Sequence, residues 1–295
     1  MDPVAIFLRP IVLPPLLTCP HCRHGGDELY RQSDNKDGKL IRCPRCQGEF
    51  DRASAIDEMF ANGTPQGYAE WTGGVVAAGM GSCYAGQSVL LDVRGRIERI
   101  YDINIGLNGS WPAGGLSATF LPQGYIMAAV APYPEPTSSE PVKLLIQATG
   151  AAPDATPLSP YREILLEARR IAITAPKLTT ILCVAALDLF FEETSGGTVR
   201  RNRPSVWVKL FTRATGRSLG DSLGDRDLRS LHRLLAVRDA HAHGRAYIQA
   251  LPPEIQEPEQ NYLKMAHVHE KPLAPSALWA LSVTLQTIRQ ASKRS

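Results

Sequence analysis

The sequence lacks any apolar run long enough to cross a membrane. Nowhere in its 295 residues does an unbroken apolar stretch reach about 18 residues, the length that a spanning helix needs. Residues 1–17 are apolar, but four prolines interrupt them, and they carry neither a basic start nor a small-residue cleavage site. These absences argue against secretion and membrane insertion, so we expect a cytoplasmic protein without a membrane partner.

The chain also has little net charge, and a value of +3 selects no partner by itself. The charge is uneven, however, because residues 161–245 contain fifteen Lys and Arg against nine Asp and Glu. Such an excess suits a polyanion, although an ordinary solvated basic face has the same composition. With 44% hydrophobic and 21% charged residues, wholesale disorder is excluded, and the length allows two or three domains.

Cysteine is scarce outside two short pairs. Four of the six cysteines form the pattern CxxC, twenty residues, CxxC, made by Cys19, Cys22, Cys43 and Cys46. Each pair is expected to form a tight turn whose two thiolates face one cation, and two such turns complete the tetrahedral sulfur shell that suits Zn²⁺. A shell of four thiolates is closed, so the metal would be structural; a redox CxxC pair is the alternative.

This pattern resembles a zinc ribbon and defines the first predicted domain, residues 1–55, which includes the N-terminal lead. A turn over residues 34–38 and a strand over Leu40–Arg42 are expected between the two pairs. So small a domain has little core, so the metal should supply most of its folding free energy. Because four thiolates already complete the shell, His21 and His24 are expected at the surface.

Residues 56–157 form the second predicted domain, which is rich in β-formers. Glycine and proline separate short runs of these residues, as is typical of a small antiparallel sandwich or barrel. A short helix and five strands are expected, over Ala55–Ala61, Ser88–Val93, Ile97–Ile105, Ser117–Phe120, Tyr125–Val130 and Val142–Ala148. The domain contains no nucleophile elbow, P-loop or dinucleotide fingerprint, and Cys83 is expected to be buried.

The third predicted domain, residues 158–295, is helical. Ser159 and Pro160 form a typical helix start. The expected helices are Tyr161–Thr174, Lys177–Thr194, Ser205–Ala214, Asp225–His243 and Pro275–Ser292. The second of these is apolar almost all round and is therefore expected at the centre of the bundle. A basic loop with three candidate RNA-binding residues precedes the third helix: Arg200, Arg201 and Arg203.

The fourth predicted helix ends in a polar segment, Arg-Asp-Ala-His-Ala-His-Gly, at residues 238–244. Arg238 continues the apolar stripe of this helix, where a charge is costly unless it is paired or lines a site. His241 and His243 add two groups that titrate near neutrality, and Gly244 offers a C-terminal cap. The segment is therefore expected to carry chemistry.

Arg-x4-His at a helix end, inside a compact bundle of four or five helices, resembles the HEPN superfamily, whose motif is Arg-x(4–6)-His. Arg238 and His243 match the two fixed positions, and Asp239 stands where Asn is commoner in catalytic members. The resemblance covers about residues 158–293. It implies a metal-independent endoribonuclease with a defence or toxin role, whose preceding domains sense a trigger or bind RNA.

The resemblance also implies residue roles. His243 would move a proton to or from the attacking 2′-hydroxyl or the leaving oxygen, and Arg238 would stabilise the scissile phosphate. Asp239, four residues before His243, would orient its ring, and His241 is a candidate second proton carrier. Because Arg238 and His243 differ by about 140° around a regular helix, a homodimer that pairs two bundles about a twofold axis would help to assemble the cleft.

Two alternatives stay open. Arg238 can be a structural residue paired with Asp188 or Glu192, with His243 favoured by the helix dipole; the protein would then be a non-catalytic module that binds nucleic acid or a protein. His-x-His pairs at 241/243 and 267/269 would instead form a metal site. The sequence as a whole predicts a multidomain α+β protein with a zinc ribbon, a β-rich middle domain and an all-α HEPN-like bundle.

Overall fold

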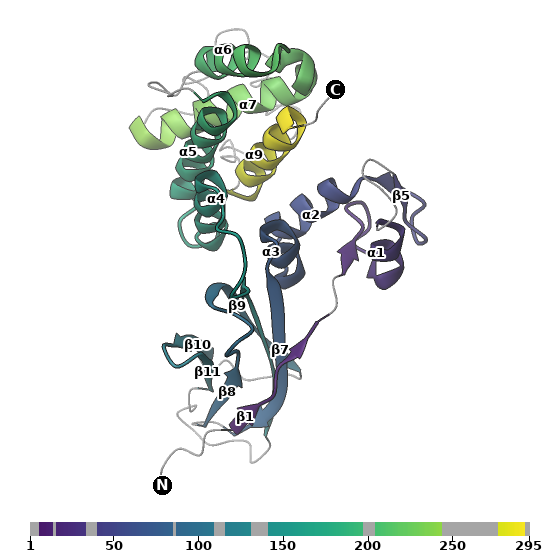
Figure 1. Cartoon of the computed structure of the whole chain (residues 1–295), viewed down its shortest axis with the longest axis vertical. Helices are drawn as coiled ribbons and strands as arrows, with labels where there is room; N and C mark the ends of the chain where they lie inside the picture. Colours follow the sequence, from purple (N-terminus) through teal and green to yellow (C-terminus); the bar gives the residue numbers. More distant parts are fainter. Residues whose placement is uncertain are drawn as a thin grey trace, which may run out of the picture. The chain divides into compact units, whose positions relative to one another are not determined.

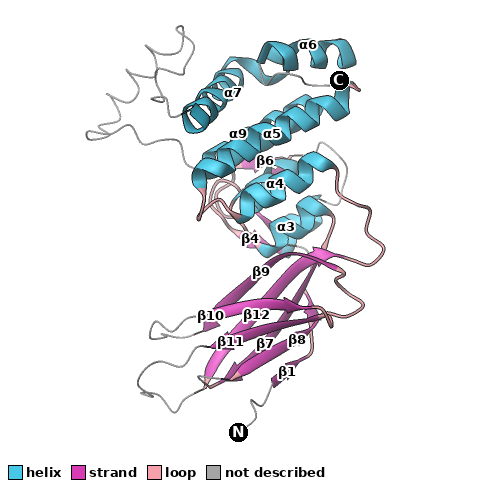
Figure 2. Ribbon diagram, turned by 90° about the vertical axis from the view of Figure 1, so that its left-hand side faces the viewer, coloured by secondary structure: helices cyan, strands magenta, loops and turns pink. Residues whose placement is uncertain are grey.

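The structure is a computed structural model that describes residues 6–13, 16–33, 40–84, 87–108, 116–130, 141–196, 204–243 and 277–292. The chain divides into two compact units, residues 1–157 and 158–295 (Figure 1). Strands and helices share the first unit, whereas the described part of the second is helical (Figure 2). The expected mixed α+β class is therefore confirmed.

The first unit contains a small cysteine-bearing segment, which we call the cysteine unit (residues 17–50). Two short hairpins and one helix build it: β3 (Leu17–Thr18), β4 (Gly25–Gly26), α1 (Asp27–Ser33), β5 (Ile41–Arg42) and β6 (Glu49–Phe50). Its core is formed by fully or nearly fully buried side chains from these elements, and Ala55 and Met59 of α2 (Arg52–Ala61) extend it. This core is small, so a metal bound by the cysteines would add substantially to the stability of the segment.

Two four-stranded sheets pack around one core in the rest of the first unit (Figure 2). Sheet A has the order β1-β8-β11-β10, formed by Ile6–Leu8, Ser88–Asp92, Tyr125–Val130 and Leu116–Leu121. Sheet B has the order β2-β7-β12-β9, formed by Ile11–Val12, Val75–Cys83, Val142–Ala151 and Arg99–Asn108. The N-terminal lead, placed with the ribbon on sequence grounds, thus contributes β1 and β2 to the two sheets.

Strand β7 was not expected, because glycines punctuate it. A Cβ atom at Gly79 would lie 2.6 Å from Leu91 Cδ1, and one at Gly81 would lie 2.6 Å from Leu8 Cδ2. These glycines therefore let the leucines of sheet A approach the backbone of sheet B closely. Residues that look like breakers in the sequence are here a requirement of face-to-face packing.

Helix α3 (Pro65–Thr72) packs on the outer side of sheet B. Thr64 caps its first turn by accepting from the amide of Gly67, and Gly73 ends it with φ 69°. The hydroxyl of Thr149 on β12 donates to the carbonyl oxygen of Pro65 at 3.2 Å. Part of the outer face of sheet B, with its buried Val76, is therefore covered.

The second unit is described as five helices: α4 (Pro160–Arg170), α5 (Pro176–Ser195), α6 (Pro204–Thr215), α7 (Leu219–His243) and α9 (Ala277–Ser292). Helix α5 contacts the other four and is central, as its all-round apolar sequence predicts. Gly224 interrupts α7 with φ 73° and ψ 163°, so the segment from Asp225 onward is a helix of its own. No helix of the described residues is long and apolar enough to cross a membrane.

Candidate functional site

The two CxxC segments have the same backbone. The amide of Cys19 donates to His24 O at 2.8 Å, and the amide of Cys43 donates to Gly48 O at 3.0 Å. The fifth residue of each loop is in the left-handed region, with φ 58° at Arg23 and 60° at Gln47. Each pair is therefore closed by its own turn, which points both thiols to one side.

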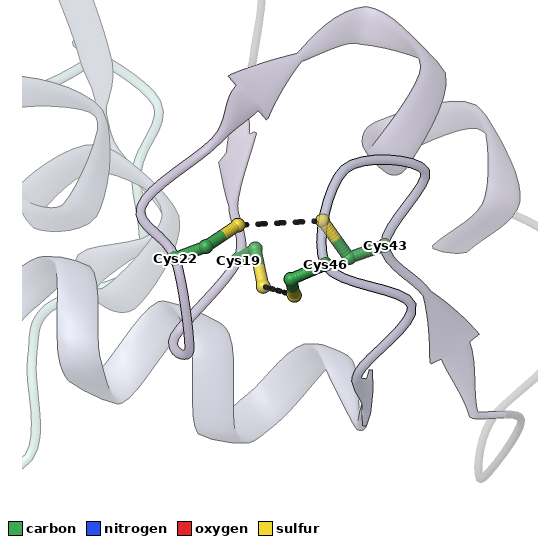
Figure 3. A group of neighbouring side chains, drawn as sticks. All are labelled: Cys19, Cys22, Cys43 and Cys46. Carbon is green, nitrogen blue, oxygen red and sulfur yellow. Dashed lines mark hydrogen bonds between the residues drawn. The ribbon is translucent and has the colours of Figure 1, made fainter.

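The two loops bring the four sulfur atoms together (Figure 3). All lie within 4.8 Å of one another, and the Sγ atoms are 3.7 Å apart for Cys19 and Cys46 and 3.6 Å apart for Cys22 and Cys43. A tetrahedron with metal–sulfur bonds of about 2.3 Å has edges of about 3.8 Å. The donor set and its spacing thus fit a closed four-thiolate metal site, and Zn²⁺ suits this chemistry.

Backbone amides around the sulfurs favour their anionic form. Burial raises the pKa of the Cys43 thiol, but hydrogen bonds from the amides of Cys46 and Arg45 and from the thiols of Cys22 and Cys19 together outweigh it, so the pKa falls to about 6. Burial dominates at Cys19, whose pKa is raised even though the amides of Cys22 and His21 donate to it. Both loops direct amide donors at sulfur, as a site for thiolates requires.

His21 connects the two loops without joining the sulfur cluster. Its Nε2 lies 3.1 Å from the carbonyl oxygen of Glu49, and its ring meets Phe50 edge-on at 6.3 Å between centroids. A Cβ atom at Gly48 would lie 2.6 Å from Cδ2 of this ring. The ring is therefore a structural contact between the loops, and it is exposed as expected.

In the second unit, the motif arginine faces the central helix. Arg238 is half-buried on α7, its Nε atom is buried, and its charge acts on the carboxylate of Asp188 on α5. Oδ1 of Asp188 accepts a hydrogen bond from the indole Nε1–H of Trp207 at 2.7 Å. Trp207 is fully buried on α6. One carboxylate on α5 is thus hydrogen-bonded to α6 and lies within the electrostatic influence of a guanidinium on α7.

The environment of Asp188 opposes its ionisation. Burial raises the pKa of this carboxyl to about 6, and the nearby Glu192 adds to the effect. The Trp207 hydrogen bond and the charge of Arg238 act in the opposite direction. Asp188 is therefore a group that changes its charge within about two pH units of neutrality.

His241 faces the same central helix. It is half-buried, and burial followed by the charge of Lys177 at the start of α5 lowers its pKa. Because residues three apart are neighbours on a helix surface, Arg238 and His241 lie on one side of α7. The structure therefore places these two site residues on one side of α7, where each interacts with the charge of a residue of α5.

Other predicted site residues are outside what the structure describes. The backbone of α7 includes Asp239 and ends at His243, but their side chains lie outside the described residues. The same holds for the whole of residues 197–203, with their three arginines, and for residues 244–276, with the second His-x-His pair. Their roles stay predictions.

Sequence reasoning missed Trp207. A buried indole needs an acceptor for its N–H, and the apolar stripe of the third predicted helix places this tryptophan toward the bundle. Asp188 is an acidic residue on the most apolar helix, so its carboxylate can accept the hydrogen bond that the buried indole N–H must donate. That signal was present in the sequence, but no spacing rule pairs residues on different helices.

Comparison with family models, curated proteins and solved structures gave no match. The function is therefore inferred from the residues of this chain alone. In the second unit these are the Arg238–His243 spacing and the surroundings of Arg238 and His241.

Proposed function

We propose that the second unit is a metal-independent endoribonuclease of the HEPN type. The observation that carries the proposal is the placement of Arg238, half-buried at the end of α7 beside Asp188. Trp207 fixes the Asp188 carboxylate by a hydrogen bond, and the charge of this carboxylate attracts the arginine. A guanidinium held in this way is suited to bind a phosphate through two parallel hydrogen bonds. His241 lies on the same side of the helix.

The proposed reaction needs only side chains of this chain. His243 removes the proton from a ribose 2′-hydroxyl, and the 2′-oxygen forms a bond to the adjacent phosphorus. The bond from phosphorus to the 5′-oxygen breaks, and the imidazolium returns the proton to that oxygen. Arg238 stabilises the charge that develops on the phosphate, Asp239 orients the His243 ring, and His241 is the second proton carrier. The products are a 2′,3′-cyclic phosphate and a 5′-hydroxyl.

The remaining parts of the proposal assign partners. Two copies of the helical unit pair as a homodimer and complete the cleft, and Arg200, Arg201 and Arg203 contact the RNA backbone. The cysteine unit holds a structural Zn²⁺ through its four thiolates. The first unit senses a trigger or binds RNA, and the enzyme acts in the cytoplasm in a defence or toxin role.

A second candidate function is a non-catalytic module that binds nucleic acid or a protein partner. The same pair of residues favours it, since opposite charges on α5 and α7 that attract each other also help to hold the two helices together. In that case Arg238 would matter for stability and not for chemistry. The two functions therefore differ in what its removal changes.

The test is an incubation of purified protein with mixed RNA in EDTA, with Arg238→Ala and His243→Ala beside the wild type. Elemental analysis of each sample confirms that the cysteine-bound metal survives. Matched controls on the same helix are the exposed Arg229→Ala and the half-buried His232→Ala. A second substrate carries a single 2′-deoxyribose at the cleavage site, which removes the attacking group.

The expected result is cleavage by the wild type and both controls, with cyclic phosphate ends, and no cleavage by the two motif variants. The 2′-deoxy substrate should stay intact at the modified site. Cleavage by His243→Ala at the wild-type rate would refute the catalytic assignment. Binding of RNA without cleavage by any sample, together with a lower melting temperature for Arg238→Ala, would favour the non-catalytic module.

A further inference from the structure

The outer face of sheet A presents an aromatic and apolar row to solvent. Phe7 on β1 stands opposite Leu90 on β8, Leu90 opposite Met127 on β11, and Met127 opposite Thr119 on β10. Phe7 is 66% exposed, although it lies on an ordered strand next to large neighbours. Leu90 and Met127 are only half-buried. An apolar row that is left uncovered on the outer side of a sheet by the described residues is a candidate binding surface.

A second ring and a guanidinium extend this row. The ring of Tyr125 on β11 meets Phe7 edge-on, with centroids 6.1 Å apart. The guanidinium of Arg94 lies over the Tyr125 ring, 4.6 Å from its centroid, and is fixed by two hydrogen bonds to Asp92 at 2.9 and 2.7 Å. The face thus offers two aromatic rings and one planar cation, which are the groups on which nucleobases stack.

The charge beside the rings has the sign that a phosphate backbone needs. Arg94 and Arg96 both act on the single carboxylate of Asp92 and lower its pKa. Two guanidinium groups against one carboxylate leave a local excess of positive charge, and Arg96 is exposed. Exposed hydroxyls of Ser117 and Thr119 on β10 supply hydrogen-bonding groups at the other side of the face.

Sheet B also has an exposed apolar residue on its outer face, but without aromatic rings or a guanidinium beside it among the described residues. Its outer face carries Met80, which is 69% exposed, opposite Leu145. No aromatic ring contact or cation over a ring involves either residue among the described parts of the chain. Met80 therefore matches Phe7 in exposure and in position on a sheet face, but not in stacking ability.

From these observations we infer that the outer face of sheet A binds single-stranded nucleic acid, with bases stacked on Phe7 and on the Arg94 guanidinium that covers Tyr125, and with phosphates held by Arg96. Stacking on aromatic side chains tolerates any base, so the surface would bind without strong sequence preference. The inference does not depend on cleavage by the second unit, because it concerns a different surface and a different measurement.

The experiment measures binding of a fluorescein-labelled oligouridylate of about 12 nucleotides, a length that fits one sheet surface, by anisotropy. All samples are the full chain with His243→Ala, so that the RNA stays intact, and a DNA oligonucleotide of the same length is measured in parallel. The variants are Phe7→Ala, Phe7→Leu and Arg96→Ala, and Met80→Ala is the matched control. Circular dichroism confirms that each variant is folded.

Phe7→Ala should weaken binding by at least about five-fold, and Phe7→Leu should weaken it equally, because leucine keeps the apolar contact but has no π-face. Met80→Ala should bind as the parent does. Arg96→Ala should reduce the slope of log affinity against log salt by about 0.7 between about 50 and 200 mM. Equal binding of both oligonucleotides identifies general single-strand binding, and tighter RNA binding identifies RNA as the ligand.

Three results would overturn the inference. Absence of binding by the parent protein would do so, and so would equal affinities for Phe7→Ala, Met80→Ala and the parent. Full binding by Phe7→Leu with loss in Phe7→Ala would show an apolar contact of the kind that a protein partner makes. The nuclease proposal is tested separately, because its test reads cleavage by the wild type and not affinity.

Discussion

The cysteine unit and the end of α7 concentrate polar groups in different ways. In the cysteine unit each thiol pair is closed by its own turn, and the two turns have the same backbone hydrogen bonds. At α7 the polar residues depend on other helices, since Arg238 acts on Asp188 of α5, which is bound to Trp207 of α6. The first arrangement is set by local spacing and the second by tertiary packing. A site of the second kind should therefore respond to changes far from it in sequence.

The largest expected effect separates the two regions. Cys43→Ser should remove the metal and unfold residues 17–50, because structural zinc contributes about 10–16 kcal/mol in small metal domains, more than so small a core can replace. The helical unit should keep its melting transition. Elemental analysis and hydrogen exchange over both regions measure this. His21→Ala is the control, since His21 contacts Glu49 O but is no ligand, and it should retain one metal ion. Retention of metal by Cys43→Ser would contradict the four-thiolate site.

The same contrast explains which features the sequence predicts. The cysteine cluster follows from spacing alone, and the central position of α5 follows from its all-round apolar composition. The sequence did not predict strand β7, because Gly79 and Gly81 look like strand breakers. The structure shows that these glycines make room for Leu8 and Leu91 of the other sheet. Packing between two sheets is a tertiary contact, so the residue pattern within one segment does not predict it.

The candidate site follows the same rule. The sequence placed Arg238 and His241 at the end of one helix, and it named Asp188 as one of two acidic partners for the arginine. It did not indicate that Trp207 would donate to Asp188, because Trp207 comes from a helix whose position depends on the whole bundle. Likewise, nothing in the spacing of Phe7 indicated that it would stand beside Tyr125 on one sheet.

A second prediction breaks the tertiary junction and leaves the cysteine unit alone. Trp207→Phe keeps a buried ring but removes the N–H group that donates a hydrogen bond to Asp188. This loss should destabilise the helical unit by about 2 kcal/mol. The half-buried Trp279→Phe on α9 is the matched control, and its loss should be clearly smaller. Thermal melting followed at helix-sensitive wavelengths compares the two. Equal losses would mean that the indole hydrogen bond adds nothing beyond ring packing.

A third prediction concerns pH. The folded pKa of Asp188, about 6, is above its ordinary value of 3.8. Its contribution to stability is therefore fully present below the ordinary value and is lost as pH rises through about 6. Asp188→Asn does not titrate, so wild type should lose more stability than this variant between about pH 5 and pH 7. Melting temperatures across this range test it, with the exposed Glu193→Gln as control. Parallel pH profiles for wild type and Asp188→Asn would show that the carboxyl is not perturbed.

The smallest expected effect returns to the symmetry of the two cysteine loops. Arg23 and Gln47 occupy the left-handed region, which disfavours residues with a Cβ by about 1 kcal/mol. Arg23→Gly should therefore stabilise the loop and tighten metal binding a few-fold, less the entropy that glycine adds to the unfolded chain. Gln47→Gly should gain less, because it also loses the hydrogen bond from Gln47 Nε2 to Pro44 O at 3.0 Å.

The control for this prediction is Arg45→Gly. Arg45 lies in the second cysteine loop, together with Gln47, but is not in the left-handed region. It should bring no gain, since only the entropic cost of glycine remains. Competition with a zinc chelator measures the three affinities. Equal shifts for Arg23→Gly and Arg45→Gly would show that backbone strain is not what limits metal binding at this site.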